Sequence, residues 1–134
     1  MTSKVLFISA SRKDANTLSR MLQSLSLDLD HAASIQSART KLNQGSYEVV
    51  LTEACLPDGK WLDVLHVVRD SGQPAEVIVT DPRADAEFWA EALNLGAYDL
   101  LAQPFYEPEV RRILCNAFHT ALHRQPVPMT MAAV

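Results

Sequence analysis

The sequence predicts a single α/β domain in which helices cover both faces of a parallel sheet. Strand-like and helix-like segments alternate five times along the chain, which is the pattern that such a sheet produces. The 134 residues are 48% hydrophobic and 21% charged, as in an ordinary globular protein that needs neither disulfides nor metals to fold. No internal repeat interrupts the alternation, so we expect one domain over residues 1–124.

Five short segments predict the strands of this sheet. They lie at residues 4–9, 29–33, 47–52, 76–80 and 98–102. The first is continuously apolar and the third is a run of β-favouring apolar residues, as expected of strands that are buried on both faces. The sequence therefore predicts that these two strands lie inside the sheet rather than at its edge.

Five segments in which apolar residues recur at intervals of three and four predict the helices. The first helix follows a turn at residues 11–14, the second runs from about residue 34 to 45, and the third starts near residue 61 and stops at residues 71–74. The fourth covers residues 85–95, and the fifth carries an apolar stripe over residues 110–122. We expect Gly45 and Gly96 to close the second and fourth helices.

Charge and hydropathy exclude several functional classes. The formal net charge is −4 and no basic cluster is present, so we expect no direct contact with nucleic acid. No apolar run approaches the roughly 20 residues needed to cross a bilayer, and the apolar start is too short for a signal peptide, so a cytoplasmic protein is expected. Cys55 and Cys115 lack metal-type spacing and are expected to be free thiols. Residues 125–134, uncharged and with two prolines, are expected to form a flexible tail or linker stub.

The third strand brings an acidic residue to the end of the sheet where ligands usually bind. It ends in Glu53, and the turn-forming sequence Leu-Pro-Asp-Gly follows at residues 56–59. In an open parallel sheet, ligands and chemistry gather at the carboxyl ends of the strands. Glu53 is therefore the first candidate for a functional residue.

A second motif completes a pattern that resembles the receiver domain of bacterial two-component response regulators. It is Gly-Ala-Tyr-Asp-Leu-Leu-Ala-Gln-Pro-Phe at residues 96–105, and the resemblance covers roughly residues 4–124. The resemblance implies a flavodoxin-like doubly wound sheet in the order 2-1-3-4-5, with its site at the carboxyl ends of strands one, three, four and five. It also implies a cis bond between Gln103 and Pro104, since members of this family usually hold that proline cis.

The resemblance also assigns the phosphorylation site, and most of its residues differ from the family pattern. The phosphoacceptor aspartate corresponds to Glu53, the two Mg²⁺-binding acids to Ser9 and Ala10, the hydroxyl residue to Thr80 and the lysine to Gln103. Only Thr80 keeps the expected type. Mg²⁺ prefers carboxylate oxygens, and phosphoryl transfer depends on close positioning. The pattern therefore implies that Mg²⁺ binding and phosphorylation are lost, and we expect no cofactor and no enzymatic activity.

Two interpretations of Glu53 remain open. It is either a relic acid that turns toward Thr80 or solvent, or a permanent imitation of the phosphorylated state. The imitation would be partial, because a glutamate carries one negative charge where a phosphorylated side chain carries about 1.5–2.

The resemblance further implies an interaction surface made by the fourth helix, the fifth strand and the fifth helix. Relatives use this face to bind partners or to dimerise, and aromatic residues are frequent at such interfaces. Trp89, Leu93 and Tyr98 are the candidate interface residues, the alternative being that Trp89 packs as semi-buried core. Leu100 corresponds to the aromatic switch position of the family and has no hydroxyl.

The favoured interpretation is an atypical receiver that is not phosphorylated and serves as a protein-interaction module in signalling. One alternative is a flavodoxin-like protein that binds a flavin phosphate through Ser9, Ser11 and Asn16 at the start of the first helix. Another is a receiver that is still phosphorylated by a non-standard route. His119 and His123 lie four positions apart on the last helix and are interpreted as surface histidines, because no third metal ligand is evident.

Overall fold

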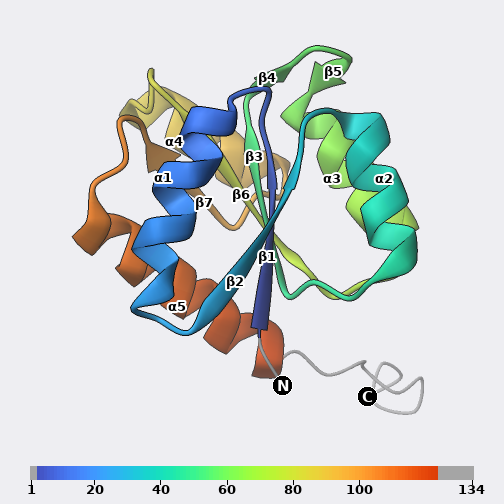
Figure 1. Ribbon diagram of the computed structural model, residues 1–134. Helices are drawn as coiled ribbons and strands as arrows, with labels where there is room; N and C mark the ends of the chain where they lie inside the picture. Colours follow the sequence, from blue (N-terminus) through green and yellow to red (C-terminus); the bar gives the residue numbers. More distant parts are fainter. Residues whose placement is uncertain (1–2, 124–134) are drawn as a thin grey trace, which may run out of the picture.

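The computed structural model describes residues 3–123, and its main sheet has five parallel strands in the order β2-β1-β3-β6-β7 (Figure 1). The strands are β1 (Ser3–Ile8), β2 (Leu27–Ala32), β3 (Val49–Glu53), β6 (Glu76–Asp81) and β7 (Asp99–Ala102). The helices are α1 (Arg12–Gln23), α2 (Ile35–Gln44), α3 (Trp61–Asp70), α4 (Ala86–Leu95) and α5 (Glu107–His123). The predicted doubly wound architecture and strand order are confirmed.

The sheet separates two apolar cores, because side chains along a strand point alternately to its two faces. Figure 1 shows α1 and α5 on one side of the sheet and α2 and α3 on the other. Phe7 and Leu51 pack with α1 and α5, whereas Leu6 and Val50 pack with α2, α3 and α4. All four side chains are fully buried. Because both faces are covered, the central strands are apolar at almost every position.

Side-chain caps fix where three of the helices begin. Ser11, Ser34 and Asp85 each accept a hydrogen bond from the backbone N–H three residues further on, at distances of 3.1, 3.2 and 2.8 Å respectively. Such caps satisfy N–H groups that have no partner inside the helix. At the other end of α4, Gly96 adopts a left-handed conformation with φ +116°, which confirms its predicted role as the cap.

Two strands begin at positions that differ by two residues from those predicted. β2 begins at Leu27 rather than at residue 29, and β3 begins at Val49 rather than at residue 47. Leu27 pairs with Ser3 of β1, so the register with the neighbouring strand, rather than apolar content, sets this end. Tyr47 stays outside β3 because its backbone N–H donates to the side chain of Gln73 at 2.7 Å.

The segment after β3 is more ordered than the loop that the sequence predicts. Cys55–Leu56 (β4) and Gly59–Lys60 (β5) form a two-stranded antiparallel hairpin before α3. The hairpin packs closely, because a Cβ atom on Gly59 would lie 2.6 Å from Cδ1 of Ile35 and 2.7 Å from a carboxylate oxygen of Asp63. Strands of two residues carry no periodic pattern, which explains why sequence analysis found only the turn.

The described residues also bear on three smaller predictions. The bond between Gln103 and Pro104 is cis, as the resemblance implied. Cys55 and Cys115 are free and exposed, which confirms the prediction. Across residues 3–123, no helix combines the length and the apolar character needed to cross a membrane. The predicted tail at residues 125–134 lies outside the described residues.

Candidate functional site

Polar side chains from neighbouring strands converge at the carboxyl end of the sheet. Ser9 follows β1, Glu53 ends β3, and Thr80 in β6 is paired with Glu53 in the strand register. The hydroxyl of Ser9 donates a hydrogen bond of 2.6 Å to Oε1 of Glu53. The structure thus brings two of the predicted site residues into direct contact.

Ser9 is held at this edge by further hydrogen bonds, and its side chain is fully buried. Its backbone N–H donates to the carbonyl of Ala32 at 2.9 Å, and its hydroxyl oxygen accepts the N–H of Ser11 at 2.9 Å. Nε2 of His31 donates to its carbonyl at 2.7 Å. Through Ser9, the ends of β1, β2 and β3 are therefore tied together by hydrogen bonds.

The role of His31 was missed by sequence reasoning. His31 lies in β2, pairs with Phe7 of β1, and stacks on the Phe7 ring with the ring centroids 6.1 Å apart. Its only signal in the sequence is its place in an edge strand that was predicted next to β1. A single histidine in such a strand does not indicate which carbonyl it will reach, so the contact with Ser9 follows from the register alone.

The orientation of Glu53 corrects one expectation. The relic interpretation expected its carboxylate to turn toward Thr80 or solvent, whereas Glu53 is half-buried and bonded to Ser9. The hydroxyl of Thr80 is fully buried and donates to the carbonyl of Leu101 at 2.8 Å. Because Thr80 has a backbone acceptor on its neighbouring strand, the hydroxyl available to Glu53 is that of Ser9.

Ala10, Gln103 and Pro104 complete the set of predicted pocket residues. Ala10 is exposed, and its methyl group offers no ligand atom. The backbone N–H of Gln103 donates to the carbonyl of Asp81 at 3.3 Å, which joins the end of β7 to the end of β6. The side-chain Nε2 of Gln103 is buried and has no hydrogen-bond partner among residues 3–123. None of these three residues supplies a charge.

The side chains at this edge do not fit Mg²⁺, the ion that the resemblance implies. Mg²⁺ requires near-octahedral oxygen ligands and is usually held by carboxylates. Of the corresponding positions, only Glu53 has a carboxylate, and one of its oxygens already accepts the Ser9 hydroxyl. In the described part of the chain, no group of three or more His, Cys, Asp or Glu side chains could hold a metal ion.

Asp81 adds a charged residue that sequence reasoning also missed. Its carboxylate follows Thr80 and accepts hydrogen bonds from the backbone N–H of Arg83 at 2.9 Å and from Nε of Arg83 at 3.4 Å. The Asp-Pro sequence signalled a turn, but it did not indicate that the aspartate would bind the residue beyond the proline. These contacts fix the loop between β6 and α4.

The turn after Glu53 is anchored to α2. The carboxylate of Asp58 accepts hydrogen bonds from the backbone N–H groups of Ile35 at 2.9 Å and Gln36 at 3.1 Å. These bonds lower the pKa of the Asp58 carboxyl because they favour its charged form, and the bond from Ile35 has the largest effect. Asp58 therefore supports the position of the loop beside the site.

The face formed by α4, β7 and α5 exposes one of the predicted interface residues. Trp89 is 48% exposed, and its Nε1 donates to Oδ1 of Asp99 at 3.0 Å. A hollow of about 330 Å³ lies beside it. The alternative that Trp89 packs as semi-buried core is wrong, because a polar contact holds its ring at the surface.

The other residues of this face are less accessible. Leu93 and Tyr98 are half-buried, and the Tyr98 hydroxyl lies 3.2 Å from that of Thr120. Leu100, the switch-equivalent residue, is 7% exposed and packs in the core beneath α2, α3 and α4. Trp89 is therefore the accessible aromatic residue among the three candidates.

Two remaining candidate groups are engaged in local contacts. His119 and His123 have ring centroids 4.2 Å apart, and Nδ1 of His123 lies 2.8 Å from the carbonyl of His119. Of the residues considered for a flavin phosphate, Ser9 is bonded to Glu53 and Ser11 caps α1, while Asn16 is exposed. These hydroxyls already serve the protein's own hydrogen bonds.

A doubly wound five-stranded sheet with polar residues at its strand ends and a cis proline after the last strand defines a receiver-type domain. The chain belongs to the response regulator receiver domain family, which its residues 5–114 match. This membership favours the receiver over the flavin-binding alternative.

Curated relatives of the chain are longer than it is. The swarming motility regulation protein RssB of Serratia marcescens is 31% identical over 106 residues, which are 79% of this chain and 48% of RssB. The transcriptional regulatory protein DpiA of Escherichia coli K12 is 29% identical over 73 residues, or 54% of this chain and 32% of DpiA. The chain thus matches half or less of the length of these relatives.

Solved structures share the fold at low sequence identity. The signal receiver domain of an HD domain-containing protein from Pseudomonas fluorescens superposes with a TM-score of 0.82 at 20% identity, covering 92% of this chain and 100% of that one. The beryllofluoride-activated NtrC4 receiver domain dimer superposes with a TM-score of 0.76 at 23% identity, covering 88% of this chain and 98% of that one. Identities in this range establish the shared fold alone.

Proposed function

We propose that this receiver domain acts in signalling through protein contacts and does not accept a phosphoryl group. The proposal rests chiefly on the hydrogen bond between Ser9 and Glu53, at the position that corresponds to the phosphoacceptor. A carboxylate oxygen that accepts a short bond from a buried hydroxyl is a weaker nucleophile than a free one, because its charge is partly satisfied. The longer glutamate side chain also places its carboxylate differently from an aspartate.

The lack of fixed positive charge supports the same conclusion. Phosphoryl transfer is catalysed mainly by positioning and by stabilisation of negative charge on the transferred oxygens. The positions assigned to the metal ligands and the lysine carry Ser9, Ala10 and Gln103, none of which is charged at neutral pH. Arg83 is bonded to Asp81, and 80% of its side chain is exposed, so its charge is neither fixed nor desolvated.

Glu53 is better explained as a structural residue than as an imitation of aspartyl phosphate. An imitation would be expected to engage Thr80, the hydroxyl of the family site. Thr80 instead donates to Leu101, while Glu53 accepts from Ser9. The carboxylate therefore links two strand ends and does not report a phosphorylated state.

The partner surface that we propose is the face of α4, β7 and α5, with Trp89 at its centre, and a homodimer through this face is included in the proposal. Receiver domains act on other proteins in signalling, and NtrC4 has been solved as a receiver dimer. The exposed indole supports the choice, because aromatic side chains are frequent anchors at protein interfaces.

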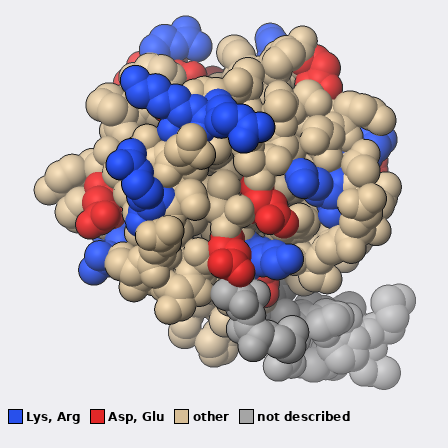
Figure 2. All heavy atoms as spheres, viewed as in Figure 1, with Lys and Arg blue, Asp and Glu red and all other residues tan. Residues whose placement is uncertain are grey.

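We also propose that the domain acts in the cytoplasm and makes no direct contact with nucleic acid. Figure 2 shows basic side chains gathered at the upper left of the face that it displays and acidic ones at its centre and edges, whereas the chain as a whole carries a formal charge of −4. A phosphate backbone would be bound more strongly by a surface with an excess of basic side chains.

A Mg²⁺ titration followed by ¹⁵N–¹H NMR tests the proposed loss of the metal site. We expect no saturable shift of the Ser9, Ala10 and Glu53 amides at millimolar Mg²⁺. The matched control is the triple variant Ser9→Asp, Ala10→Asp, Glu53→Asp, which restores the carboxylates and should show saturable shifts at these positions. Saturable shifts in the wild-type protein would contradict the proposal.

A further inference from the structure

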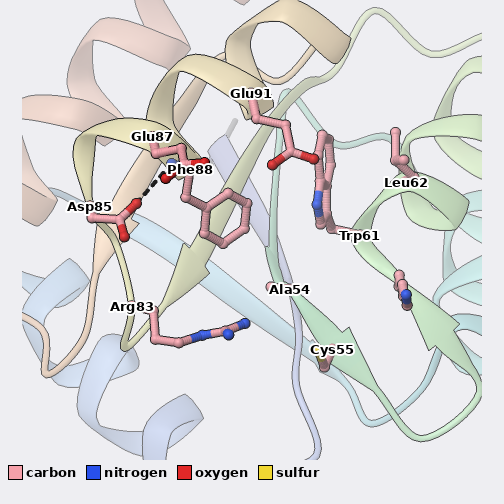
Figure 3. A pocket seen from close by; sticks show the side chains of 10 residues that line it. Ala54, Cys55, Trp61, Leu62, Arg83, Asp85, Glu87, Phe88 and Glu91 are labelled. Carbon is pink, nitrogen blue, oxygen red and sulfur yellow. Dashed lines mark hydrogen bonds between the residues drawn. The ribbon is translucent and has the colours of Figure 1, made fainter.

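A hollow of about 450 Å³ lies between the start of α3 and the start of α4, next to the site described above (Figure 3). Ala54, which follows Glu53, and Cys55 line it from the β3 side, and the loop that carries Arg83 lines it from the β6 side. None of the residues predicted for the phosphorylation site lines this hollow. It is therefore a separate feature of the surface.

Two aromatic side chains border the hollow. Figure 3 shows Phe88 of α4 and Trp61 of α3 on opposite sides of it. Trp61 is 6% exposed and belongs to the core, and the half-buried Phe88 packs against the same core. Because core packing holds both rings, the gap between them is pre-formed, and the two rings offer an apolar contact to an aliphatic side chain.

Glu91 and Arg83 lie toward different ends of this gap, and Lys60, Asp85 and Glu87 also line the hollow. In Figure 3, the Glu91 carboxylate lies next to Trp61, whereas Arg83 extends toward Ala54 from the opposite end. Among residues 3–123, neither Glu91 nor Glu87 one turn earlier forms a hydrogen bond or an ion pair through its carboxylate. Arg83 contacts Asp81 through Nε, which leaves its terminal nitrogens available.

We propose that this hollow docks a short extended segment of a partner protein in which an apolar side chain lies between a basic and an acidic one. The apolar side chain would enter the gap between Trp61 and Phe88, the basic one would face Glu91, and the acidic one would face Arg83. In an extended segment, every second side chain points to the same face, about 7 Å apart. The matching pattern is therefore basic-x-apolar-x-acidic, read in either chain direction.

The parts of this surface have different tasks. The apolar side chain of the partner supplies most of the affinity, because binding moves it out of water and into the gap between Trp61 and Phe88. The exposed charges supply orientation and discrimination, since solvent screens each pair. The volume lies in the lower part of the roughly 300–1,000 Å³ that small-ligand pockets occupy, which suits one anchor and its flanks. The docking site does not depend on whether Glu53 accepts a phosphoryl group.

The blocked pentapeptide acetyl-Arg-Ala-Leu-Ala-Glu-amide is a direct probe of the site. Titrated into the ¹⁵N-labelled protein, it is expected to shift the amides of Ala54 and Cys55 and the indole of Trp61 in a saturable way. The indole of Trp89, on another face, should not move and serves as an internal control. The same peptide with Ala in place of Leu lacks the anchor and should bind at least several-fold more weakly.

A charge exchange tests the proposed orientation. Glu91→Lys should weaken binding of the first peptide roughly three- to tenfold, since an exposed attraction becomes a repulsion. The same variant should bind acetyl-Glu-Ala-Leu-Ala-Glu-amide more tightly than the wild type does. Because Glu91 is exposed, this variant is expected to keep the fold, and its unperturbed ¹⁵N–¹H spectrum away from α4 verifies this.

Three results would overturn the docking site. The first is the absence of saturable shifts around the hollow at the highest soluble peptide concentration. The second is a set of shifts that neither the loss of Leu nor Glu91→Lys changes. The third is a concentration-dependent shift of Ala54 and Trp61 without any peptide, which would assign the hollow to a second copy of the chain.

Discussion

The hydroxyl of Ser9 donates a hydrogen bond of 2.6 Å to Oε1 of Glu53 and so joins the carboxyl ends of β1 and β3. In the family pattern, the first of these positions carries a Mg²⁺-binding acid and the second carries the phosphoacceptor aspartate. Here a neutral hydroxyl and one carboxylate meet directly. The ends of β1 and β3 are therefore held together by a hydrogen bond between two side chains of the protein.

Ser9→Ala is expected to lower the free energy of unfolding by about 1–2 kcal/mol, because it leaves the half-buried Glu53 oxygen without its donor. Urea unfolding followed by circular dichroism measures the effect. Glu53→Gln retains an oxygen acceptor and should cost less. Ser46→Ala is the matched control, since Ser46 is exposed and makes no side-chain hydrogen bond within residues 3–123. Equal stability of Ser9→Ala and Ser46→Ala would show that the contact does not stabilise the fold.

Asp58→Asn is expected to destabilise the protein at neutral pH and to lose this effect in acid. The pKa of Asp58 in the folded protein lies below its ordinary value of 3.8, because the Ile35 and Gln36 N–H groups stabilise its charge. Its contribution to stability is therefore complete above pH 3.8 and is lost as the pH falls through the folded pKa. The difference in unfolding free energy between wild type and variant should be constant from pH 7 to about pH 4 and should shrink as the pH falls below 3.8. A stability difference that does not change with pH would contradict a role for the Asp58 charge. Asp70→Asn is the control, because Asp70 is exposed.

Tyr47→Phe is expected to cost about 1–2 kcal/mol near neutral pH by removing the 2.6 Å hydrogen bond from Tyr47 to Asp30. Burial is the main cause that raises the pKa of the Tyr47 hydroxyl in the folded state, and the hydrogen bond to Asp30 and the charge of Asp30 raise it further. The stabilising contribution of the Tyr47 hydroxyl is therefore complete below its ordinary pKa of 10.0 and is lost as the pH rises above that value. Wild-type stability should fall between pH 9 and pH 11 more steeply than that of Tyr47→Phe. Parallel curves would contradict this account.

Trp89→Ala is expected to weaken self-association or partner binding roughly 30-fold or more, because it removes the indole that we propose as the interface anchor. Sedimentation velocity over a range of protein concentrations measures the dimer directly. Arg39→Ala is the control, because Arg39 is exposed on α2, which is not part of this face. Identical association of wild type and Trp89→Ala would remove this face from the proposal.

The fold could be predicted largely from the sequence because local patterns specify it. Apolar runs locate the strands, three- and four-residue spacing locates the helices, and Gly96 closes α4 as expected. The two-residue strands of the hairpin and the early start of β2 could not be predicted. Both depend on backbone pairing with a neighbour rather than on side-chain periodicity.

The candidate site could be predicted only in part. Sequence spacing placed Ser9, Glu53 and Thr80 at the same edge of the sheet, but it did not specify which of them would bond to which. The contacts of His31 and Asp58 were missed because their partners lie 22 and 23 positions away in the chain. Such contacts depend on how neighbouring elements are placed, which a pattern of residue types does not record.

The central claim is that the Glu53 carboxylate does not take up a phosphoryl group. The most direct measurement is the intact mass of the protein after incubation with acetyl phosphate and Mg²⁺, with Glu53→Gln treated in parallel. The account predicts an unchanged mass for both proteins. A gain of one phosphoryl group by the wild type, absent from Glu53→Gln, would contradict it.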